Sequence, residues 1–380
     1  MAMALVLCGS SAVGQASMTN APASTNAPSK FRSTEDGWLD VSSFLDEKYG
    51  FLPVAIQITE PAVGYGAAGG LAFVSQPLGG AQSEYDRPNI TMLGGMGTEN
   101  GSWGAVAGDL RNWMDGRLQT LAGVVYASVN LDFHGIGEDS VLANDPLRYN
   151  LEPKGGMLQS KYRIGDSRLW GGLSYAFART EVSFEAPAGT PGLPDFRSES
   201  NVGGVTPSFT LDTRDNIFTP NRGSYVEASA GLFSEALGGD DEFQRGRLIA
   251  MQYIPLHPRL HLGLRGEAAA SFGDVPFYLR PFIYMRGVPI MRYQGETTAQ
   301  IEAEARWQFW KRFSLVGFVG GGATWNDLER FDDTQTVVTG GGGFRYELAR
   351  KYGIHMGLDV AFGPDDPAIY IQVGSSWVRP

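Results

Sequence analysis

Short segments in which polar and apolar residues alternate make up most of this chain, and this two-residue period restricts its fold more than any other feature. The period is that of a β-strand, whose successive side chains point to opposite faces. Glycine, proline, asparagine and aspartate separate the segments, as turns require. From Gly50 onward the sequence contains sixteen such segments: 50 to 59, 64 to 76, 88 to 97, 102 to 110, 116 to 132, 148 to 165, 168 to 186, 202 to 213, 222 to 235, 242 to 255, 258 to 273, 297 to 311, 312 to 325, 333 to 348, 352 to 362 and 367 to 377.

The last segment distinguishes a membrane barrel from a soluble sandwich. Its residues divide between two faces: one carries Ile369, Ile371, Val373, Ser375 and Trp377, and the other carries Tyr370, Gln372, Gly374 and Ser376. An apolar outer face and a polar or small inner face are typical of transmembrane barrel strands. A soluble sandwich needs large residues on its inward faces, where this chain often has Gly, Ser, Thr, Gln, Glu and Arg. The sequence therefore predicts an all-β fold, a 16-stranded antiparallel transmembrane β-barrel.

Composition argues against two other classes of protein. No run of about 18 consecutive apolar residues occurs, so membrane-spanning helices are not expected, whereas a barrel strand needs only about 10 residues. Glycine, at 51 residues, is abundant for a soluble enzyme, and charged residues, at 19%, are few. The formal net charge of -11 and the lack of basic runs argue against a nucleic-acid partner, which requires clustered lysine and arginine.

The first residues predict a signal peptide that is removed from the mature chain. Residues 1–16 contain an apolar stretch from Met3 to Val13, which ends at a cleavage pattern of the kind that signal peptidase accepts. Cys8 is the only cysteine and lies inside this stretch, so the mature chain has no thiol. Leu7 precedes Cys8 where a lipoprotein signal requires a small residue, which argues against lipidation.

Two short segments separate the signal from the barrel. Residues 17–35 are rich in small polar residues and proline and predict a disordered linker. Residues 36–49 predict a short periplasmic segment, which forms an amphipathic helix at the barrel mouth, packs there without one, or is disordered. The apolar residues of this segment are Leu39, Val41, Phe44 and Leu45. Residues 50–377 then form the barrel.

The lengths of the connections support a meander that crosses a membrane, because outer-membrane barrels have long outer loops and short periplasmic turns. The long connections are 133 to 147, 187 to 201, 274 to 296 and 326 to 332, and the short ones of opposite parity are 111 to 115, 166 to 167, 256 to 257 and 349 to 351. Residues 77 to 87 break this rule. Aromatic girdles at the membrane interfaces would be supplied by Trp38, Trp103, Trp113, Trp310, Trp325 and Trp377.

One predicted strand places charged residues in the lumen. Alternation gives it an inner face that carries Glu302, Glu304, Arg306 and Gln308. The long connection 274 to 296 contains Arg286, which would need an acidic partner if the loop folds inside the barrel. Glu304 is the candidate, through a two-pronged ion pair that pins the loop to the wall. The alternative is that Glu304 pairs with Arg306 or with water.

Several motifs resemble the barrel of the BamA/TamA-like bacterial surface antigen superfamily, over roughly Phe51 to Trp377. They are Met285-Arg286-Gly287, Asp212-Thr213-Arg214-Asp215-Asn216 through Pro220, Arg222-Gly223 and Tyr225, Glu304-Ala305-Arg306, Gly317-Phe318-Val319 through Gly322, and the final Ile371 to Trp377. Members of this superfamily include barrel assembly and translocation proteins and the secretion barrels of two-partner systems. The resemblance implies a protein of the Gram-negative outer membrane, surrounded by its lipid, with the sixth outer loop folded inward.

The resemblance also implies a specific set of site residues. Arg286 would lock the loop into the wall at Glu304, with Phe318 packed nearby; the lock and lumen set is Arg286, Gly287, Glu304, Arg306, Phe318 and Gly322. The sequence departs from the family pattern at two positions. Val288 stands where an aromatic residue is usual, and Gly320 where the family often has aspartate. We therefore expect a lock that is looser or differently partnered.

The function that the resemblance implies is outer-membrane biogenesis or protein translocation. Between Ser17 and Gly50 there is no room for the periplasmic receiving (POTRA) domains of such proteins, because a folded domain rarely falls below about 40 residues without staples. A separate periplasmic partner or a secreted client is therefore expected. Two alternatives stay open: a passive or gated channel for small solutes or lipids, and a purely structural surface antigen.

No enzyme, cofactor or metal site is expected. The four histidines, His134, His257, His261 and His355, lie in different segments without a nucleophile at a suitable spacing. The glycine runs 320 to 322 and 340 to 343 lie in predicted strands, where glycine marks curvature or close approach rather than a phosphate loop. Asp365-Asp366 with Glu138-Asp139 is a minor candidate for a cation between loops.

Overall fold

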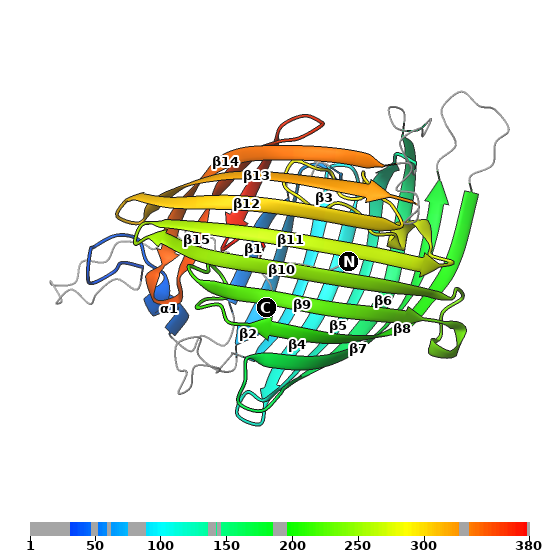
Figure 1. The fold of residues 1–380 in the computed structure, drawn as a ribbon, viewed down its shortest axis with the longest axis horizontal. Coiled ribbons are helices and arrows are strands. Elements are labelled where there is room, and N and C mark those ends of the chain that lie inside the picture. Colours follow the sequence, from blue (N-terminus) through cyan, green and yellow to red (C-terminus); the bar gives the residue numbers. More distant parts are fainter. Residues whose placement is uncertain are drawn as a thin grey trace, which may run out of the picture.

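Sixteen antiparallel strands form one sheet in the computed structural model, and each strand pairs with its neighbours in sequence (Figure 1). The structure describes residues 31–46, 52–58, 62–74, 89–135, 142, 146–184, 196–326 and 334–377. The strands are β1 (Leu52–Ile58), β2 (Gly66–Val74), β3 (Ile90–Thr98), β4 (Trp103–Trp113), β5 (Leu118–Phe133), β6 (Leu147–Arg163), β7 (Leu169–Phe184), β8 (Phe196–Asp212), β9 (Gly223–Phe233), β10 (Phe243–His257), β11 (Leu260–Gly273), β12 (Thr297–Trp310), β13 (Phe313–Trp325), β14 (Gln335–Ala349), β15 (Ile354–Phe362) and β16 (Ala368–Val373). The predicted sixteen-stranded antiparallel fold is confirmed.

The sheet curls into a barrel, so that parts of β1 and β16 come within 8 Å of each other (Figure 1). The helical elements are short: α1 (Ser42–Asp46), η1 (Glu235–Leu237), η2 (Phe277–Leu279) and η3 (Arg350–Tyr352). Among the described residues no helix is long and apolar enough to cross a membrane. The signal peptide and nearly all of the predicted linker, residues 1–30, lie outside the described part.

Alternation along the strands sorts side chains between lipid and lumen. On β12, Ile301 and Trp307 are exposed, whereas Glu302 on the opposite face is buried. On β14 the exposed Val338 alternates with Val337 and Thr339, which are buried. This is the pattern of a sheet with an apolar outer surface and a filled interior.

Strand β8 begins six residues earlier than its predicted start at residue 202. Two cross-strand ion pairs explain the extension, because Arg179 of β7 pairs with Glu199 and Glu181 pairs with Arg197. Charged pairs across an antiparallel ladder stabilise it without any apolar face. The predicted loop 187 to 201 was therefore too long, since polar residues here continue the strand.

The prediction that residues 374–377 continue the last strand is wrong. β16 ends at Val373, and Gly374 takes a φ of +79°, a turn that favours glycine. The chain then enters the lumen, where Ser375 donates its backbone N–H to the carbonyl of Phe218 and Trp377 becomes buried. Trp377 packs with residues of β9 and β10: Tyr225, Ile249, Met251 and Tyr253. Trp377 is therefore a lumen residue and no part of an outer girdle.

The N-terminal segment, residues 31–46, packs on the inner end of the barrel. The inner end is here the end of the barrel at which β14 stops. The segment lies there, because Val41 donates its N–H to the carbonyl of Leu348, near the end of β14 (Figure 1). Only Ser42–Asp46 are helical, so Leu39 and Val41 lie outside the expected helix. Residues 31–35, predicted as linker, take part in a small bridge between Arg32 and Leu39. Packing on the barrel orders this polar stretch.

An apolar cluster fills the lumen toward the opposite, outer end. It joins the inward faces of β5, β6 and β7 to the connection between β11 and β12. The buried members are Ala127, Val129, Leu131, Tyr149, Leu151, Val182 and Met291. The strands that supply it are among the longest of the sheet, at 16 or 17 residues. These strands therefore extend beyond the roughly 10 residues that hydrocarbon requires, and the connection packs against their outer ends.

Candidate functional site: the inward-folded loop and its seat

The connection between β11 and β12, residues 274–296, turns back into the barrel instead of projecting outward. Its two limbs pair with each other, since Phe282 bridges Gln294 and Ile283 donates its N–H to the carbonyl of Tyr293 at 3.0 Å. Ile283 is fully buried, and Val288 is 1% exposed. The loop is therefore a packed part of the lumen, and the following contacts form its seat.

Arg286 lies at the centre of this seat. Its Nη2 is 2.7 Å from Oε2 of Glu304 on β12. Its Nη1 donates a hydrogen bond of 2.7 Å to Oδ2 of Asp359 on β15. The guanidinium carbon lies 3.5 Å from the centre of the Phe318 ring, a cation–π contact. The structure thus brings together Arg286, Glu304 and Phe318, which the sequence placed in one site.

Asp359 is the partner that the sequence analysis missed. It is fully buried and accepts two hydrogen bonds from Arg345 of β14, at 2.5 and 2.8 Å, besides the one from Arg286. One carboxylate therefore bridges two guanidiniums in the charge-assisted geometry that gives strong hydrogen bonds. The signal was present in the alternation of β15, where Asp359 shares the inner face with Gly357 and Ala361.

The acidic partner sits on β15 because β13 has no room for it. A Cβ at Gly320, where the family often has aspartate, would lie 2.8 Å from Cγ of Glu302 and 3.0 Å from Sδ of Met285. Such distances require the neighbours to move. The expectation of a differently partnered lock is consistent with this geometry.

Glycines on β13 and β14 leave the space that the seat occupies. A Cβ at Gly341 would collide with the backbone oxygen of Val360 and lie 2.6 Å from Cζ of Phe318, so glycine there allows both β15 and the Phe318 ring to approach. A Cβ at Gly322 would meet Cδ1 of Ile283 at 2.8 Å. The glycine runs therefore provide the close approach that the sequence predicted for them.

The turn of the loop at Gly287 is held through its backbone. Gly287 has a φ of +84° and donates its N–H to the Tyr370 hydroxyl at 3.0 Å. The carbonyl of Arg286 accepts a hydrogen bond of 2.7 Å from the Thr339 hydroxyl. Val288 packs with Ile283, Met285 and Val337 in a small apolar cluster. That cluster accommodates Val288 where the family usually has an aromatic residue.

A second charged network attaches the preceding part of the loop. Arg265 of β11 donates hydrogen bonds to Glu302, at 2.5 Å, and to the carbonyl of Tyr284, at 3.1 Å. The N–H of Tyr284 in turn donates to Gln300 at 2.7 Å. Glu267 joins the network by pairing with both Arg265 and Arg247. The loop is thus fixed at two successive points along the lumen wall.

Two other groups of residues that the sequence suggested as functional lie outside this site. Arg306 contacts Asn221 and belongs to a pocket nearer the inner end. Asp365 forms an ion pair with Arg292 of the same loop, and Glu138 lies outside the described residues. Within the described part of the chain, no group of three or more His, Cys, Asp or Glu residues is placed to hold a metal ion.

Comparisons with known proteins identify the same kind of barrel. A family model described as the Omp85 superfamily domain matches residues 195–284, which end two residues before Arg286. No curated protein sequence matches the chain. The crystal structure of BamA from Haemophilus ducreyi lacking POTRA domains 1–3 shares the fold at 12% identity and a TM-score of 0.56, covering 91% of this chain and 80% of that one.

Two further barrels share the fold at similarly low identity. CdiB from Escherichia coli is 12% identical with a TM-score of 0.60, covering 84% of this chain and 61% of its own. CdiB from Acinetobacter baumannii is 10% identical with a TM-score of 0.56, covering 86% of this chain and 60% of its own. This chain therefore spans less than two thirds of either CdiB chain. The family match over residues 195–284 and these shared folds support the resemblance and the barrel fold.

Proposed function

We propose that this chain, an outer-membrane barrel that carries an Omp85 superfamily domain, acts in outer-membrane biogenesis or in protein translocation. The observation that carries the proposal is the seat of the inward-folded loop, in which Arg286 pairs with both Glu304 and Asp359. A barrel that served only as a surface scaffold would not need a buried, doubly paired arginine in its lumen, because burying charge is costly.

The lock connects strands that are not neighbours. Glu304 lies on β12 and Asp359 on β15, with β13 and β14 between them. One guanidinium therefore holds the loop and also fixes the curvature of four strands. We propose that this gives a client polypeptide a lumen wall of defined shape. The partners would be a secreted or membrane-inserted client, a separate periplasmic protein that delivers it, and the surrounding lipid.

The test is the abundance of other outer-membrane proteins when the gene is deleted. The proposal predicts that deletion lowers the amounts of some of them, and that the wild-type gene restores these amounts more fully than Arg286→Ala does. Arg292→Ala, in the same loop but paired with the partly exposed Asp365, is the matched control and should restore fully. An outer-membrane proteome unchanged by deletion would reject the proposal.

A channel for small solutes or lipids is the second candidate, and the polar lining of the lumen favours it. Lys161 and Glu227 form a lumen ion pair of 3.3 Å, and Arg247 pairs with Glu267 across β10 and β11. The apolar cluster around Tyr149 and Met291 obstructs the outer end, so conduction would require the loop to move. Purified barrel in planar bilayers should then conduct, with gating altered by Arg286→Ala. Absence of conductance from both forms would reject this candidate.

A further inference from the structure

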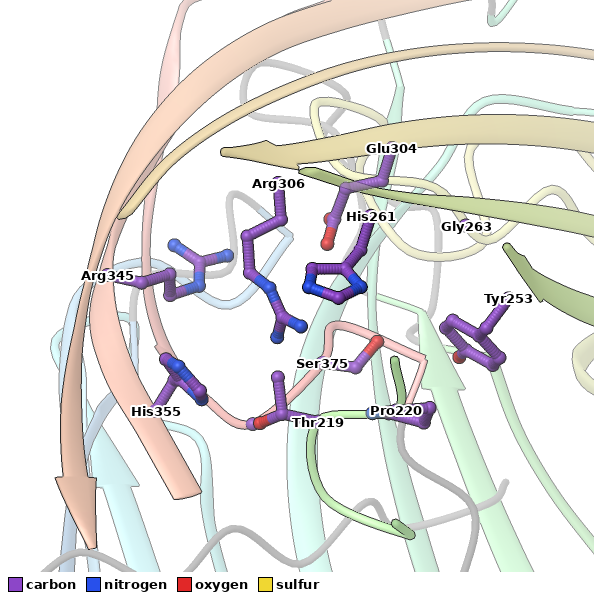
Figure 2. Close-up of a pocket in the computed structure, with 11 residues that line it drawn as sticks. Thr219, Pro220, Tyr253, His261, Gly263, Glu304, Arg306, Arg345, His355 and Ser375 are labelled. Atoms are coloured by element: carbon purple, nitrogen blue, oxygen red, sulfur yellow. The ribbon is translucent and has the colours of Figure 1, made fainter. Parts of the chain in front are cut away.

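A second set of basic lumen side chains surrounds a small pocket toward the inner end of the barrel (Figure 2). The pocket lies between β11, β12, β14, β15, the turn 213–222 and residues 374–375. Arg306, Arg345, His261 and His355 line it together with Thr219, Ser375 and one carboxylate, that of Glu304. Its volume of about 20 Å³ suffices for one water-sized particle. The sequence showed the histidines as scattered, and the fold brings two of them to one site.

Arg306 differs from the other lumen arginines in its partners. Figure 2 shows its side chain extending into the space between His261 and His355. Its Nη2 hydrogen-bonds to Oδ1 of Asn221, a neutral group. Among the described residues, no carboxylate oxygen comes within 4.0 Å of its guanidinium nitrogens. Glu304, the alternative partner considered from the sequence, is engaged by Arg286 instead.

The charges around the pocket do not balance. Three guanidiniums, those of Arg286, Arg306 and Arg345, share the two carboxylates of Glu304 and Asp359. Among these five groups, Arg306 is therefore left without a carboxylate in direct contact, which is unfavourable in a confined interior unless another group contacts it.

The next carboxylates are committed elsewhere. Asp215 accepts the backbone N–H groups of Asn221 and Arg222. Glu347 pairs with Arg350 at 3.2 Å. Neither lies within ion-pair distance of Arg306 in the described structure, so these carboxylates act on its guanidinium only from a distance.

Two polar atoms at the pocket lack partners as well. Oγ1 of Thr219 and Nδ1 of His261 are buried, and neither has a hydrogen-bond partner among the described residues. A hydroxyl donates freely, and an imidazole nitrogen donates in one of its tautomers. Buried groups of this kind imply an unseen water or ion. Water would satisfy both atoms but leave the positive charge, whereas an anion would satisfy all three groups.

We propose that this pocket binds one small monovalent inorganic anion of halide size, held by Arg306 with donors from Thr219 and His261. The anion would join the 213–222 turn to β11 and β12. Because Ser375 also lines the pocket, the bound anion would brace the segment that carries Trp377 into the lumen. The proposal is independent of what the barrel transports or inserts.

The test uses the full-length barrel crystallised in bromide, with anomalous scattering to locate the ion. A bromide peak is expected beside Arg306, and it should be absent in Arg306→Gln. Chloride should also raise the thermal unfolding temperature above its value in gluconate of equal ionic strength, saturably, because gluconate is too large for the pocket. Thr219→Val, which removes one donor with little change in shape, should weaken the halide effect if Arg306→Gln does not fold.

The control is Arg197→Gln, which removes an arginine from the outer end of β8 and should keep the full halide effect. A pocket that holds only water in bromide overturns the proposal. A peak that survives both substitutions, with the same unfolding temperature in chloride and gluconate, marks an adventitious ion only and also overturns it.

Discussion

At the scale of single residues, the guanidinium of Arg286 determines how the loop is held. Lysine would keep the charge but present one donor head, which cannot reach Glu304 and Asp359 together in planar geometry. The ring of Phe318, 3.5 Å from the guanidinium carbon, favours the flat arginine head as well. The three contacts act on one group, so we expect strongly coupled effects when any of them is removed.

Arg286→Lys should lower the stability of the folded barrel, and Arg286→Ala should lower it further. Breaking a buried ion pair by removing one partner costs about 3–5 kcal/mol, and lysine should retain part of this. The measurement is the midpoint of heat-induced unfolding, followed by the gel mobility of the folded barrel. Arg292→Lys in the same loop should change it less, because the Arg292–Asp365 pair is partly exposed and lysine keeps its charge. Equal midpoints for wild type and Arg286→Ala would contradict the lock.

Gly341→Ala should disturb the seat without touching any charge. The added Cβ would collide with the backbone oxygen of Val360 on β15 and lie 2.6 Å from Cζ of Phe318, so both the strand pairing and the ring must shift. Forcing extra atoms into a packed interior costs about 1–3 kcal/mol. Gly342→Ala is the matched control, because its Cβ would face outward with its nearest neighbour at 3.3 Å. Hydrogen exchange of residues 283–288 should rise in the first variant only. Equal exchange in both would show that the glycine is not needed for space.

Alternation along β12 placed Glu304 in the lumen, and the family resemblance implied that the loop with Arg286 folds inward, so the two could be predicted as partners. The contact of Arg286 with Asp359 could not be predicted in this way. The inner-face position of Asp359 could be read from the sequence, but the bridge to Arg286 depends on barrel curvature, which brings β15 to a loop that follows β11. Spacing along the chain contains no information on that curvature. The same holds for His261 and His355, which meet only in the folded lumen.

At the scale of elements, residues 31–46 bind to the inner end of strands β12, β13 and β14. Arg312, fully buried in the turn between β12 and β13, donates to both oxygens of Asp36 and to Asp40 at 2.8 Å. Trp38 packs edge-on against Trp310 and Phe313. The segment is therefore fixed by charge at its centre and by aromatic rings at its side. Trp38, which the sequence suggested for an aromatic girdle, thus takes part in the contact between this segment and the barrel.

Acid should release this segment. The hydrogen bonds that Arg312 donates hold the pKa of Asp36 at about 2, below its usual 3.8. A lowered folded-state pKa gives stability that is present above pH 3.8 and lost as pH falls toward 2. Hydrogen exchange at Val41, whose N–H bonds to Leu348, should therefore accelerate in that interval beyond its intrinsic pH dependence.

Asp36→Asn is the direct control for the acid response. It should expose Val41 to exchange already at neutral pH and remove the added response between pH 4 and 2. Asp166→Asn, which breaks the exposed pair with Arg117, should leave the segment unchanged. A segment that stays equally protected at pH 2 and pH 7 would show that aromatic packing alone holds it.

The number and order of the strands could be predicted from local sequence patterns, whereas the exact ends of the strands could not. The sixteen alternating segments correspond one by one to the sixteen strands, because period and turn residues are local properties. The errors lie at the ends of β8 and β16. Cross-strand ion pairs extended the first, and a turn at Gly374 ended the second. Both depend on a partner strand or a lumen contact that is distant in sequence.

At the scale of the whole molecule, the barrel is a curved wall around a loop that it holds at several points. Toward the outer end the loop packs in an apolar cluster through Met291. Deeper in the lumen Arg286 pairs with β12 and β15, two strands that are three places apart in the sheet order. The central claim is that this pairing holds loop and wall as one unit.

A double-mutant cycle of Arg286→Ala and Asp359→Ala, measured as heat stability of the folded barrel, tests that claim most directly. The two residues are 73 positions apart in sequence and share a hydrogen bond of 2.7 Å. The account predicts that the double variant loses less stability than the sum of the single losses, with a coupling of about 0.5–3 kcal/mol. Strictly additive losses would mean that the two side chains act separately, and would contradict the lock.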